Sequence, residues 1–534
     1  MLAWKLFRRQ ATNEPGFNLT ILSNMTAISL HFELPENLTA RKLLKKLSKK
    51  LDFEIATQQY TIKTFYDSFD WRLYNADMVC EFNHSQIVSQ LNLLDRKTGA
   101  LIASENMQDI PAFSEDFPNG RLKKCLEDQL QMRALLPVCH PQYEAYRLNV
   151  LNKDKKIVLR LEIDEYELFA NHIRLLPLKG YDKAARKVSD FLQESLELKP
   201  ADNTVLNIAL KLQGRKVKDY SSKLVIKLKP KMRADEASIV IYRHLLKAIQ
   251  ANEAGTIAAT DTEFLHDFRV AVRRTRSGLS QLKNTLPASV VAQYAGFFSW
   301  LGQITGLTRD LDVYLLSYKK YKEAIPISLR EDISPLYDFL KQNQTQAQKE
   351  LVKKLESLEY REQLRAWEQY LKEPLSKKRE ETHANTSIKE LADQRIWKVY
   401  KRILNEGEAI NESSPAEALH DLRKTCKKLR YLMEFFQSLY TEEDMKVSLK
   451  ALKGFQTVLG DFQDYEIQEF NIKQFSEEMM AKNVPANTLL AMGVLVQYLD
   501  KMKCRARNDF AKQFAVFNRV ENKSAFKILF SNKA

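Results

Sequence analysis

The amino-acid sequence predicts a multi-domain protein in which an α+β domain precedes an all-α domain. Three observations support this. Short β-like runs alternate with helical patches up to about residue 230. From Asp235 to about Lys512 helical periodicity is almost continuous. Only 14 glycines and 15 prolines occur in 534 residues, and a scarcity of helix breakers over long stretches favours helices.

The N-terminal part carries the signals of a largely antiparallel sheet. Two helical patches, Thr39–Leu51 and Tyr181–Leu198, interrupt a series of short runs rich in β-branched and aromatic residues. Many strands with interspersed helices indicate an α+β arrangement. The expected strands are Ala27–Leu34, Gln59–Phe65, Met78–Phe82, Ile87–Leu94, Ile157–Ile163, His172–Pro177 and Leu224–Leu228.

The C-terminal part predicts helices throughout. The clearest 3.6-residue periods lie in Ser238–Asn252, Thr262–Asn284, Gln346–Leu371 and Ser387–Asn405. Because the pattern changes near residues 229–234, we place the domain boundary at Pro230. The expected organisation is an N-terminal extension at 1–26, an α+β domain at 27–230, an all-α domain at 231–515 and a C-terminal tail at 516–534.

The composition indicates a globular protein with an anionic partner. Hydrophobic residues make up 44% of the chain, and 83 Lys and Arg against 68 Asp and Glu give a net charge of +15. Such a balance concerns association and not the fold. The chain has no apolar run of about 18 residues, so we expect a cytoplasmic protein without a membrane partner. The five cysteines are scattered without a CxxC pair, which argues against a disulfide framework and a zinc site.

An internal repeat with an offset of 154 residues lies within the all-α domain. The segment Leu265-His266-Asp267-Phe268-Arg269 recurs as Leu419-His420-Asp421-Leu422-Arg423. Equivalent basic residues follow: Arg273, Arg274 and Arg276 in the first copy, and Lys427, Lys428 and Arg430 in the second. Downstream in the same register, Gly306 and Asp310 match Gly460 and Asp464. The repeat predicts two pseudo-symmetric bundles, at 231–384 and 385–515.

Each repeated segment predicts a helix with one apolar face and one cationic face. At about 100° per residue from His266, Arg269 lies at about −60°, Arg273 at about −20° and Arg274 at about +80°. The apolar side chains lie opposite, where they can pack. Like charges at this spacing repel one another, so a face that keeps them in both copies indicates an anion site. The candidate residues are His266, Arg269, Arg273, Arg274, Arg276, His420, Arg423, Lys427, Lys428 and Arg430.

The start of each repeated helix supports an anion site. Thr260–Glu263 and Ser414–Glu417 both fit an S/T-x-x-E capping box. The histidines would then lie within two turns of a helix N-terminus, where free N–H groups and the helix dipole favour negative charge. We assign the Gly306/Asp310 and Gly460/Asp464 pairs to structure, as a close helix approach and an acid that orients a neighbouring Arg or His.

Other interpretations apply to the same residues. A single basic helix face is usually only solvated, as we expect for Lys42–Lys50, although that face can also meet an anion. The sequence has no phosphate-binding G-x-x-x-x-G-K-S/T loop, H-E-x-x-H motif or serine nucleophile elbow. We therefore name no catalytic residue, metal ligand or cofactor.

The repeated motif with its G-x-x-x-D sequel resembles the CHAD domain over about residues 231–515. The resemblance implies an all-helical domain of two pseudo-symmetric bundles that binds inorganic polyphosphate through basic residues and histidines. It also implies association with polyphosphate granules. The first copy contributes Leu265–Leu279 and Gly306–Val313 to this resemblance, and the second contributes Leu459–Asp464.

The N-terminal part resembles a CYTH domain, also called a triphosphate tunnel domain. Thr64–Leu73 is similar to that family's Y-Y-D-T-x-x-x-x-L segment, and Tyr146–Ile163 to its R-x-x-x-x-L…D strand pair. The family's metal-holding E-x-E-x-K strand is replaced by Ile28–Leu34, with one acid, and its later E-x-E-L-K strand by Arg174–Lys179, with none. Phosphate hydrolysis assisted by Mg²⁺ needs such carboxylates. We therefore expect a degenerate, tunnel-like scaffold without triphosphatase activity, in which Lys179 is a candidate phosphate contact.

The expected function is binding of polyphosphate without bond breaking. One alternative is a metal-dependent triphosphatase or polyphosphatase that acts through the CYTH-like domain. RNA binding is another, but single-strand binders interleave cations with aromatic residues for base stacking, and the basic face of the first helix has none. A third is a scaffold for an acidic protein. The sequence leaves polyphosphate length preference and oligomeric state open.

Overall fold

The computed structural model describes residues 30–35, 37–85, 89–201, 204–375 and 380–531. The chain forms two compact units. The sheet unit comprises Met1–Leu130 and Leu135–Asp219, and the helical unit comprises Gln131–Ala134 and Tyr220–Ala534. The division between Asp219 and Tyr220 comes earlier in the sequence than the expected boundary at Pro230. The expected extension at 1–26 lies outside the described residues.

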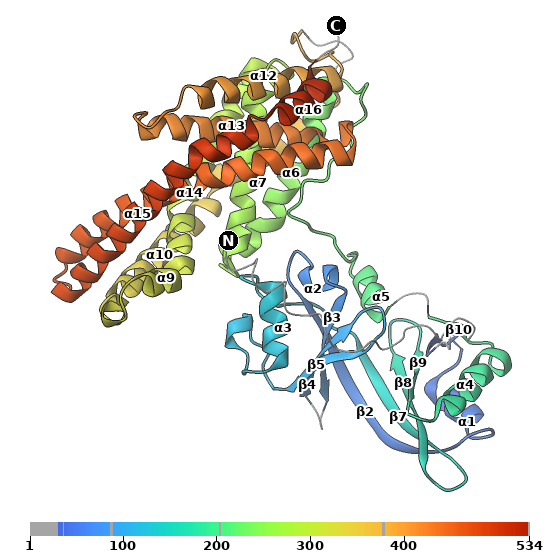
Figure 1. The fold of residues 1–534 in the computed structure, drawn as a ribbon. Coiled ribbons are helices and arrows are strands. Elements are labelled where there is room, and N and C mark those ends of the chain that lie inside the picture. The colour runs from blue at the N-terminus through green and yellow to red at the C-terminus, as the bar shows by residue number, and fades with distance from the viewer. Residues whose placement is uncertain (1–29, 36, 86–88, 202–203, 376–379, 532–534) are drawn as a thin grey trace. The chain divides into compact units, whose positions relative to one another are not determined.

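The sheet unit contains one antiparallel sheet (Figure 1). Its ten described strands run in the order β10-β1-β9-β8-β7-β2-β3-β4-β5, with β6 paired to β2. The strands are β1 (His31–Glu33), β2 (Asp52–Asp67), β3 (Met78–Ser85), β4 (Ser89–Asp95), β5 (Leu101–Asn106), β6 (Leu136–Cys139), β7 (Gln142–Leu151), β8 (Ile157–Tyr166), β9 (His172–Pro177) and β10 (Lys199–Pro200). The predicted antiparallel α+β fold is thus confirmed.

Helices α1 (Ala40–Leu47), α3 (Arg121–Leu130) and α4 (Asp182–Asp190) cover one face of this sheet because its strands alternate in polarity, while α5 (Val205–Leu212) packs on Phe65 of the opposite face. Leu159, Leu161 and Ile163 of β8 pack with α1 and α4 in one apolar cluster. A second cluster joins β3, β4 and β5 to α3. The sheet unit also contains α2 (Arg72–Asn75). The residues between the apolar positions of each strand therefore face the other side of the sheet.

One expected strand is wrong. Leu224–Leu228 alternates apolar and polar residues, yet it is irregular chain in the helical unit. Leu224, Ile226 and Leu228 insert into the helical core, and the backbone between them pairs with no strand. An extended segment that packs on helices has the same period of two as a β-strand.

The helical unit consists of helices in a duplicated order (Figure 1). The helix pair α6 (Ala234–Ile257) and α7 (Thr262–Gln281) recurs as α12 (Ile388–Glu408) and α13 (Ala416–Phe436). Both members start 154 residues after their counterparts, which is the offset of the sequence repeat. The remaining helices are α8 (Ala288–Ile304), α9 (Gly306–Ala324), α10 (Ser334–Leu355), α11 (Leu358–Lys372), α14 (Glu442–Met480), α15 (Ala486–Phe517) and α16 (Val520–Phe530).

The two repeats differ at one break. In the first, α8 ends and α9 begins around Thr305, whereas in the second the equivalent stretch is the uninterrupted α14. Apolar residues of both repeats share one core. That core also includes Phe526 and Phe530 of α16, so most of the expected tail at 516–534 is a packed helix. Residues 532–534 lie outside the described residues.

The predicted capping boxes are wrong. Asp261, not Thr260, is the N-cap of α7, and its carboxylate accepts the N–H groups of Glu263 (2.9 Å) and Phe264 (3.2 Å). The N-cap of α13 is Pro415, which has no side-chain cap. A carboxylate at the N-cap stabilises the helix start as a hydroxyl would, so the sequence signal marked the correct region.

Asp261 and Asp267 hold a buried arginine in the helical unit. The guanidinium of Arg133 donates to Asp261 Oδ1 (3.2 Å) and to Asp267 Oδ2 (2.6 Å), and none of its side chain is exposed. Tyr220 also donates to Asp267 Oδ2 (3.0 Å) and in turn accepts from Asn252 (2.8 Å). The equivalent acid of the second repeat, Asp421, is exposed.

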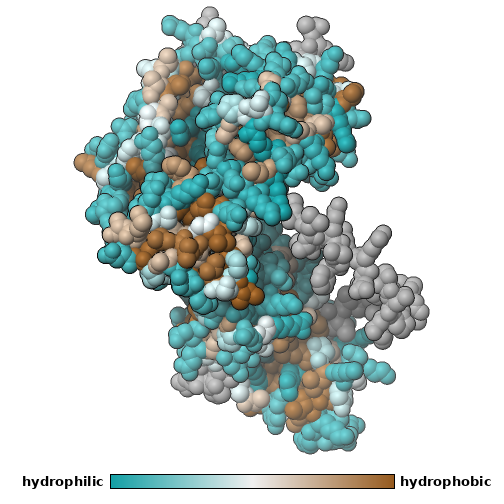
Figure 2. Space-filling view, turned by 60° about the vertical axis from the view of Figure 1, so that its left-hand side comes forward, coloured by the Kyte–Doolittle hydropathy of each residue, from teal (hydrophilic) through white to brown (hydrophobic). Residues whose placement is uncertain are grey.

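The face shown in Figure 2 is mostly hydrophilic, with apolar residues gathered in separate patches. None of the helices in the described residues has the length and apolar character that a bilayer crossing requires.

Candidate functional site

A hollow of about 320 Å³ lies within the helical unit. Helices α7, α9 and α14 contribute its walls, so both repeats meet there. The lining residues are His266, Arg269, Arg273, Arg309, Asp310, Val313, Tyr314, Asp464, Ile467 and Gln468. Three candidates from α7 are thus brought together with an acid of the second repeat.

Main-chain and hydroxyl acceptors hold Arg269 in place at the end of α8. Its Nη1 donates to the Gly302 carbonyl (3.0 Å) and to Thr305 Oγ1 (2.7 Å). Neither acceptor is charged. Burial lowers the pKa of Arg269 to about 10, although Asp310 opposes this shift. Arg269 is therefore fixed in direction while its positive charge remains only partly compensated.

Arg309 is a cation of the hollow that the sequence analysis did not select. It lies on α9, donates from Nη1 to the Thr262 carbonyl (3.1 Å) and approaches Glu263 Oε1 at 3.9 Å. His266 lies beside it. Burial, and next the charge of Arg309, lower the pKa of His266 to about 4. At neutral pH His266 is therefore an uncharged imidazole that can donate one hydrogen bond.

Two cations of the second repeat, Arg423 and Lys427, lie close to Arg273, although neither lines the hollow itself. Burial lowers the pKa of Arg423, and it lowers the pKa of Lys427 to about 8; the charge of Arg273 adds to both shifts. Arg273 itself has a buried Nε without a hydrogen-bond partner among the described residues. The cations of α7 and α13 therefore form one positive region.

Acids compensate only part of this charge. Arg423 donates to Gln463 Oε1 (2.5 Å) and to Asp464 Oδ1 (3.4 Å). Asp310 and Asp464 line the hollow, and burial raises the pKa of both. The five cations Arg269, Arg273, Arg309, Arg423 and Lys427 outnumber the three acids around them, Glu263, Asp310 and Asp464, so positive charge remains in excess near pH 7.

The remaining candidates also lie outside the lining of the hollow. Arg274 Nη2 and Arg430 Nε each lie 2.7 Å from a carboxylate oxygen of Glu434, which neutralises part of their charge. His420 Nε2 lies 2.5 Å from Glu466 Oε2. Arg276 is exposed and lies near Gly302, while Lys428 is half-buried. The candidates therefore divide into a central group and a peripheral group.

Sequence signals existed for some of the missed residues. Arg309 stands three positions after Gly306, inside the motif that defined the repeat. Glu434 follows Arg430 at a spacing of four, which is typical of helical ion pairs. The structural role given to the glycines is not general, because a Cβ at Gly460 would meet no atom within 4 Å. At Gly306 it would lie 3.8 Å from Arg269 Nη1, an ordinary contact distance.

In the sheet unit, charged side chains on the face opposite α1, α3 and α4 pair with one another. Lys63 lies 3.1 Å from Glu81, and both side chains are at least nine-tenths buried. Arg174 lies 2.9 Å from Glu162 and 3.3 Å from Asp164. These carboxylates are thus engaged by cations of the same sheet. Lys179 lies beyond the end of β9.

Two histidines complete this face. His172 Nδ1 and His31 Nε2 are 2.8 Å apart, and only one of the two atoms can carry the shared proton. Burial lowers the pKa of His172 to about 4 and that of His31 to about 3, with neighbouring positive charges as a further cause. Both imidazoles are therefore neutral near pH 7.

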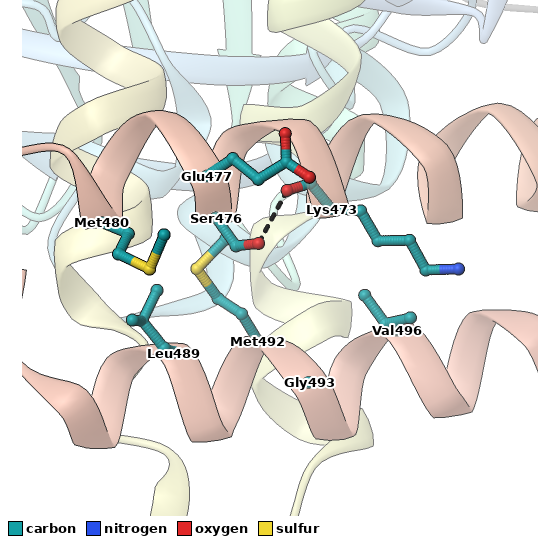
Figure 3. Close-up of a pocket in the computed structure, with 8 residues that line it drawn as sticks. All are labelled: Lys473, Ser476, Glu477, Met480, Leu489, Met492, Gly493 and Val496. Atoms are coloured by element: carbon teal, nitrogen blue, oxygen red, sulfur yellow. Dashed lines mark hydrogen bonds between the residues drawn. The ribbon is translucent and has the colours of Figure 1, made fainter.

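A second hollow, of about 250 Å³, lies between α14 and α15 and is mainly apolar (Figure 3). Met480, Leu489 and Met492 lie close to one another there, while Ser476 donates to the Lys473 carbonyl (2.7 Å). Lys473 pairs with Glu469 outside the hollow. This lining is unsuited to a phosphate chain, which requires several cations or N–H donors.

Comparisons with known proteins agree with this architecture. The CHAD domain family model matches residues 240–470. Two uncharacterized proteins of Mycobacterium tuberculosis, from strains CDC 1551 / Oshkosh and ATCC 25618 / H37Rv, are 25% identical over 244 residues, which is 45% of this chain and 45% of each relative. The chain thus spans about half the length of the curated relatives it matches.

Two solved structures are similar to parts of the chain. The crystal structure of the CHAD domain from the plant Ricinus communis is 22% identical, with a TM-score of 0.47, and covers 56% of this chain and 96% of that chain. The Hippeastrum protein HpAC1, described as a candidate adenylyl cyclase with a dominant triphosphatase activity, is 13% identical, with a TM-score of 0.28, and covers 36% of this chain and 98% of that chain. Within the helical unit, the segment that matches the CHAD domain family model, residues 240–470, includes both copies of the repeated helix, α7 and α13.

Proposed function

We propose that the helical unit binds inorganic polyphosphate at the hollow between α7, α9 and α14. The observation that carries this proposal is the excess of cations over acids around Arg273. Cations that are partly desolvated and face too few acids are destabilised, and an anion that enters relieves this cost. Polyphosphate carries about one negative charge per phosphate, so an extended polyphosphate chain can pair with a row of cations.

The residues of the site would act differently. Arg269 and Arg309 are held by main-chain acceptors and can offer their remaining N–H groups to phosphate oxygens in a fixed direction. Arg273, with its unpartnered Nε, is the central contact. Lys427 supplies a point charge, and neutral His266 donates one hydrogen bond. Release of counterions from the chain adds affinity that decreases with salt.

Titration with polyphosphate tests the proposal. The variant combines Arg269→Ala, Arg273→Ala, Arg423→Ala and Lys427→Ala. Each charge-assisted hydrogen bond contributes about 1.5–3 kcal/mol, so we expect affinity to fall at least about 100-fold. The matched control replaces four exposed cations, Lys349, Lys353, Lys354 and Arg365, by Ala and should retain affinity to within a few-fold. Circular dichroism establishes that both variants fold. Equal affinities of the two variants would contradict the proposal.

RNA is the competing polyanion. The lining of the hollow includes one aromatic residue, Tyr314, whose hydroxyl accepts from Asn471 (2.9 Å). Base binding usually needs stacked aromatic platforms, so this lining favours a bare phosphate chain. In a competition at fixed salt, labelled polyphosphate should be displaced by unlabelled polyphosphate at much lower phosphate concentration than by single-stranded RNA. Displacement by RNA at the lower phosphate concentration would indicate that the hollow is a nucleic-acid site instead.

We further propose that the sheet unit is a scaffold that does not hydrolyse phosphates. The pairing of Glu81 with Lys63, and of Glu162 and Asp164 with Arg174, supports this, because carboxylates engaged by cations are poor ligands for Mg²⁺ or Mn²⁺. Measurement of phosphate release from tripolyphosphate and long-chain polyphosphate, with either metal, tests it. Turnover that depends on metal would establish the triphosphatase alternative. Association with polyphosphate granules in the cytoplasm belongs to the same proposal, and imaging of a tagged chain tests it.

A further inference from the structure

Helix α1 of the sheet unit and the turn that follows it carry an exposed cationic surface outside the hollow. Arg41, Lys42, Lys45, Lys46, Lys49 and Lys50 are all exposed, and residues 40–50 contain no acid. We call these six residues the α1 surface. Within the described residues none of them forms an ion pair; Lys42 Nζ donates only to the Asn37 carbonyl (3.1 Å).

The fold keeps this charge on one side of the helix. Ala40, Leu43 and Leu47 are fully buried in the cluster that joins α1 and α4 to the sheet. The cations therefore occupy the remaining, solvent-facing side, where pairs such as Arg41/Lys45 and Lys42/Lys46 are neighbours of like charge. The basic residues of the last turn favour the negative end of the helix dipole, but this accounts for Lys45 and Lys46 only.

Helix α4 packs on the same apolar cluster, but it carries acids beside its cations. Lys183, Arg186 and Lys187 accompany Asp182 and Asp190 on α4, so three cations face two acids and the net charge of this helix is only +1. The excess is thus specific to α1, and the shared core holds α1 rigidly against the sheet. A fixed row of uncompensated cations is a surface for an extended anion.

We infer that the α1 surface is a second contact for long-chain polyphosphate, an inference that rests on the function proposed for the hollow. Two features distinguish this partner from others. The apolar side of α1 is consumed by the core, so the helix cannot insert it into a lipid surface as interfacial helices do. The exposed side holds no aromatic residue on which bases could stack, so single-stranded RNA gains only its phosphate contacts.

The α1 surface and the hollow differ in the binding they provide. The cations of the hollow are half-buried and partly held by hydrogen bonds, so they resist screening. Those of α1 are fully exposed, and salt at 0.15 M screens charges beyond about 8 Å. Binding at α1 is therefore weaker, without preferred geometry and strongly salt-dependent. It matters for long polymers, which can present many phosphates to the exposed row of cations at once, and not for tripolyphosphate.

The test neutralises α1 in the full-length protein. The variant combines Lys42→Gln, Lys45→Gln, Lys46→Gln, Lys49→Gln and Lys50→Gln. We expect it to bind tripolyphosphate as the wild type does. For long-chain sodium polyphosphate, we expect the slope of log affinity against log salt concentration to be smaller in magnitude by about 2–4. Its matched control removes the same charge at Lys319, Lys320, Lys349, Lys353 and Lys354 and should keep the wild-type slope.

The hollow variant separates this inference from the proposed function. The hollow variant combines Arg269→Ala, Arg273→Ala, Arg423→Ala and Lys427→Ala, and it should retain weak, salt-sensitive binding of long-chain polyphosphate. Adding the five α1 substitutions should abolish this residual binding. If the hollow variant binds like the wild type, the proposed function fails. If the α1 substitutions change neither the slope nor the residual binding, the α1 surface is not a contact. Residual binding that single-stranded RNA displaces more effectively than polyphosphate would assign α1 to nucleic acid and overturn the inference.

Discussion

Arg133 and Asp267 form a buried ion pair, with Nη2 and Oδ2 2.6 Å apart, directly beside the histidine of the first repeat. Asp267 follows His266 in the chain, so Arg133 helps to fix the start of α7 and the residues that line the hollow. A short segment of sequence between α3 and β6 thereby contributes to the helical unit. The second repeat has no such requirement, because Asp421 is exposed and pairs with Lys424 (2.9 Å).

Arg133→Ala should lower the free energy of unfolding by about 3–5 kcal/mol, because it leaves Asp261 and Asp267 buried without a cation. Urea denaturation followed by circular dichroism measures this. Adding Asp261→Asn and Asp267→Asn should recover part of the loss, since both amides can still accept hydrogen bonds. Arg121→Ala, at an exposed position, is the control. A cost below about 1 kcal/mol at Arg133 would contradict the structural role.

Arg309→Gln converts the first repeat to the residue of the second, where Gln463 occupies this position. We expect polyphosphate affinity to fall about 10- to 100-fold, since one charge-assisted contact is lost. Arg365→Gln, on the exposed side of α11, should leave affinity unchanged. Isothermal titration of both variants is the measurement, and an unchanged affinity for Arg309→Gln would exclude this residue from the site.

Polyphosphate affinity should decrease as the pH rises above about 8, the pKa of Lys427 in the free protein. A bound anion favours the protonated amine and raises its pKa, so the complex takes up a proton above pH 8 and binding weakens there. Below that pH the amine is already charged and this contribution is complete. Lys427→Arg, which stays charged, should flatten the profile. A wild-type affinity that is constant up to pH 10 would rule out Lys427 as a contact.

Acid should destabilise the sheet unit through His172. Its pKa is about 4 in the folded protein and near 6.5 in the unfolded chain, so only the unfolded chain takes up a proton between these values. The stabilisation is complete above pH 6.5 and decreases as the pH falls toward 4. Urea denaturation at several pH values should show this loss, and His172→Gln should reduce it. An identical pH dependence for the variant would assign the loss to other groups.

The sequence predicts local and repeated features of this protein well. Helices α7 and α13 start 154 residues apart, as the repeat requires, and the helical angle of Arg274 places it away from Arg269 and Arg273. The sequence does not predict which side chains from distant parts of the chain pair with each other. The pairing of Arg274 with Glu434 joins residues 160 positions apart on different helices, and no periodicity encodes such a pair.

The sheet shows the same limit. The sequence locates β9 at its observed bounds, His172–Pro177, because a short apolar run with turn signals on either side is a local property. It cannot show that Lys63 and Glu81, on adjacent strands, neutralise each other, since this depends on strand register. Predicted site residues therefore mark a region, while the structure decides which charges within it remain uncompensated.

The interruption between α8 and α9 makes the two repeats unequal in their tolerance of mutation. Arg269 is anchored partly on the Gly302 carbonyl, a main-chain group that every amino acid possesses. Arg423 depends on Gln463 and Asp464, two side chains that single substitutions can remove. Among related proteins that share this duplication, the arginine equivalent to Arg269 should therefore keep its orientation. The orientation of the arginine equivalent to Arg423 should vary more.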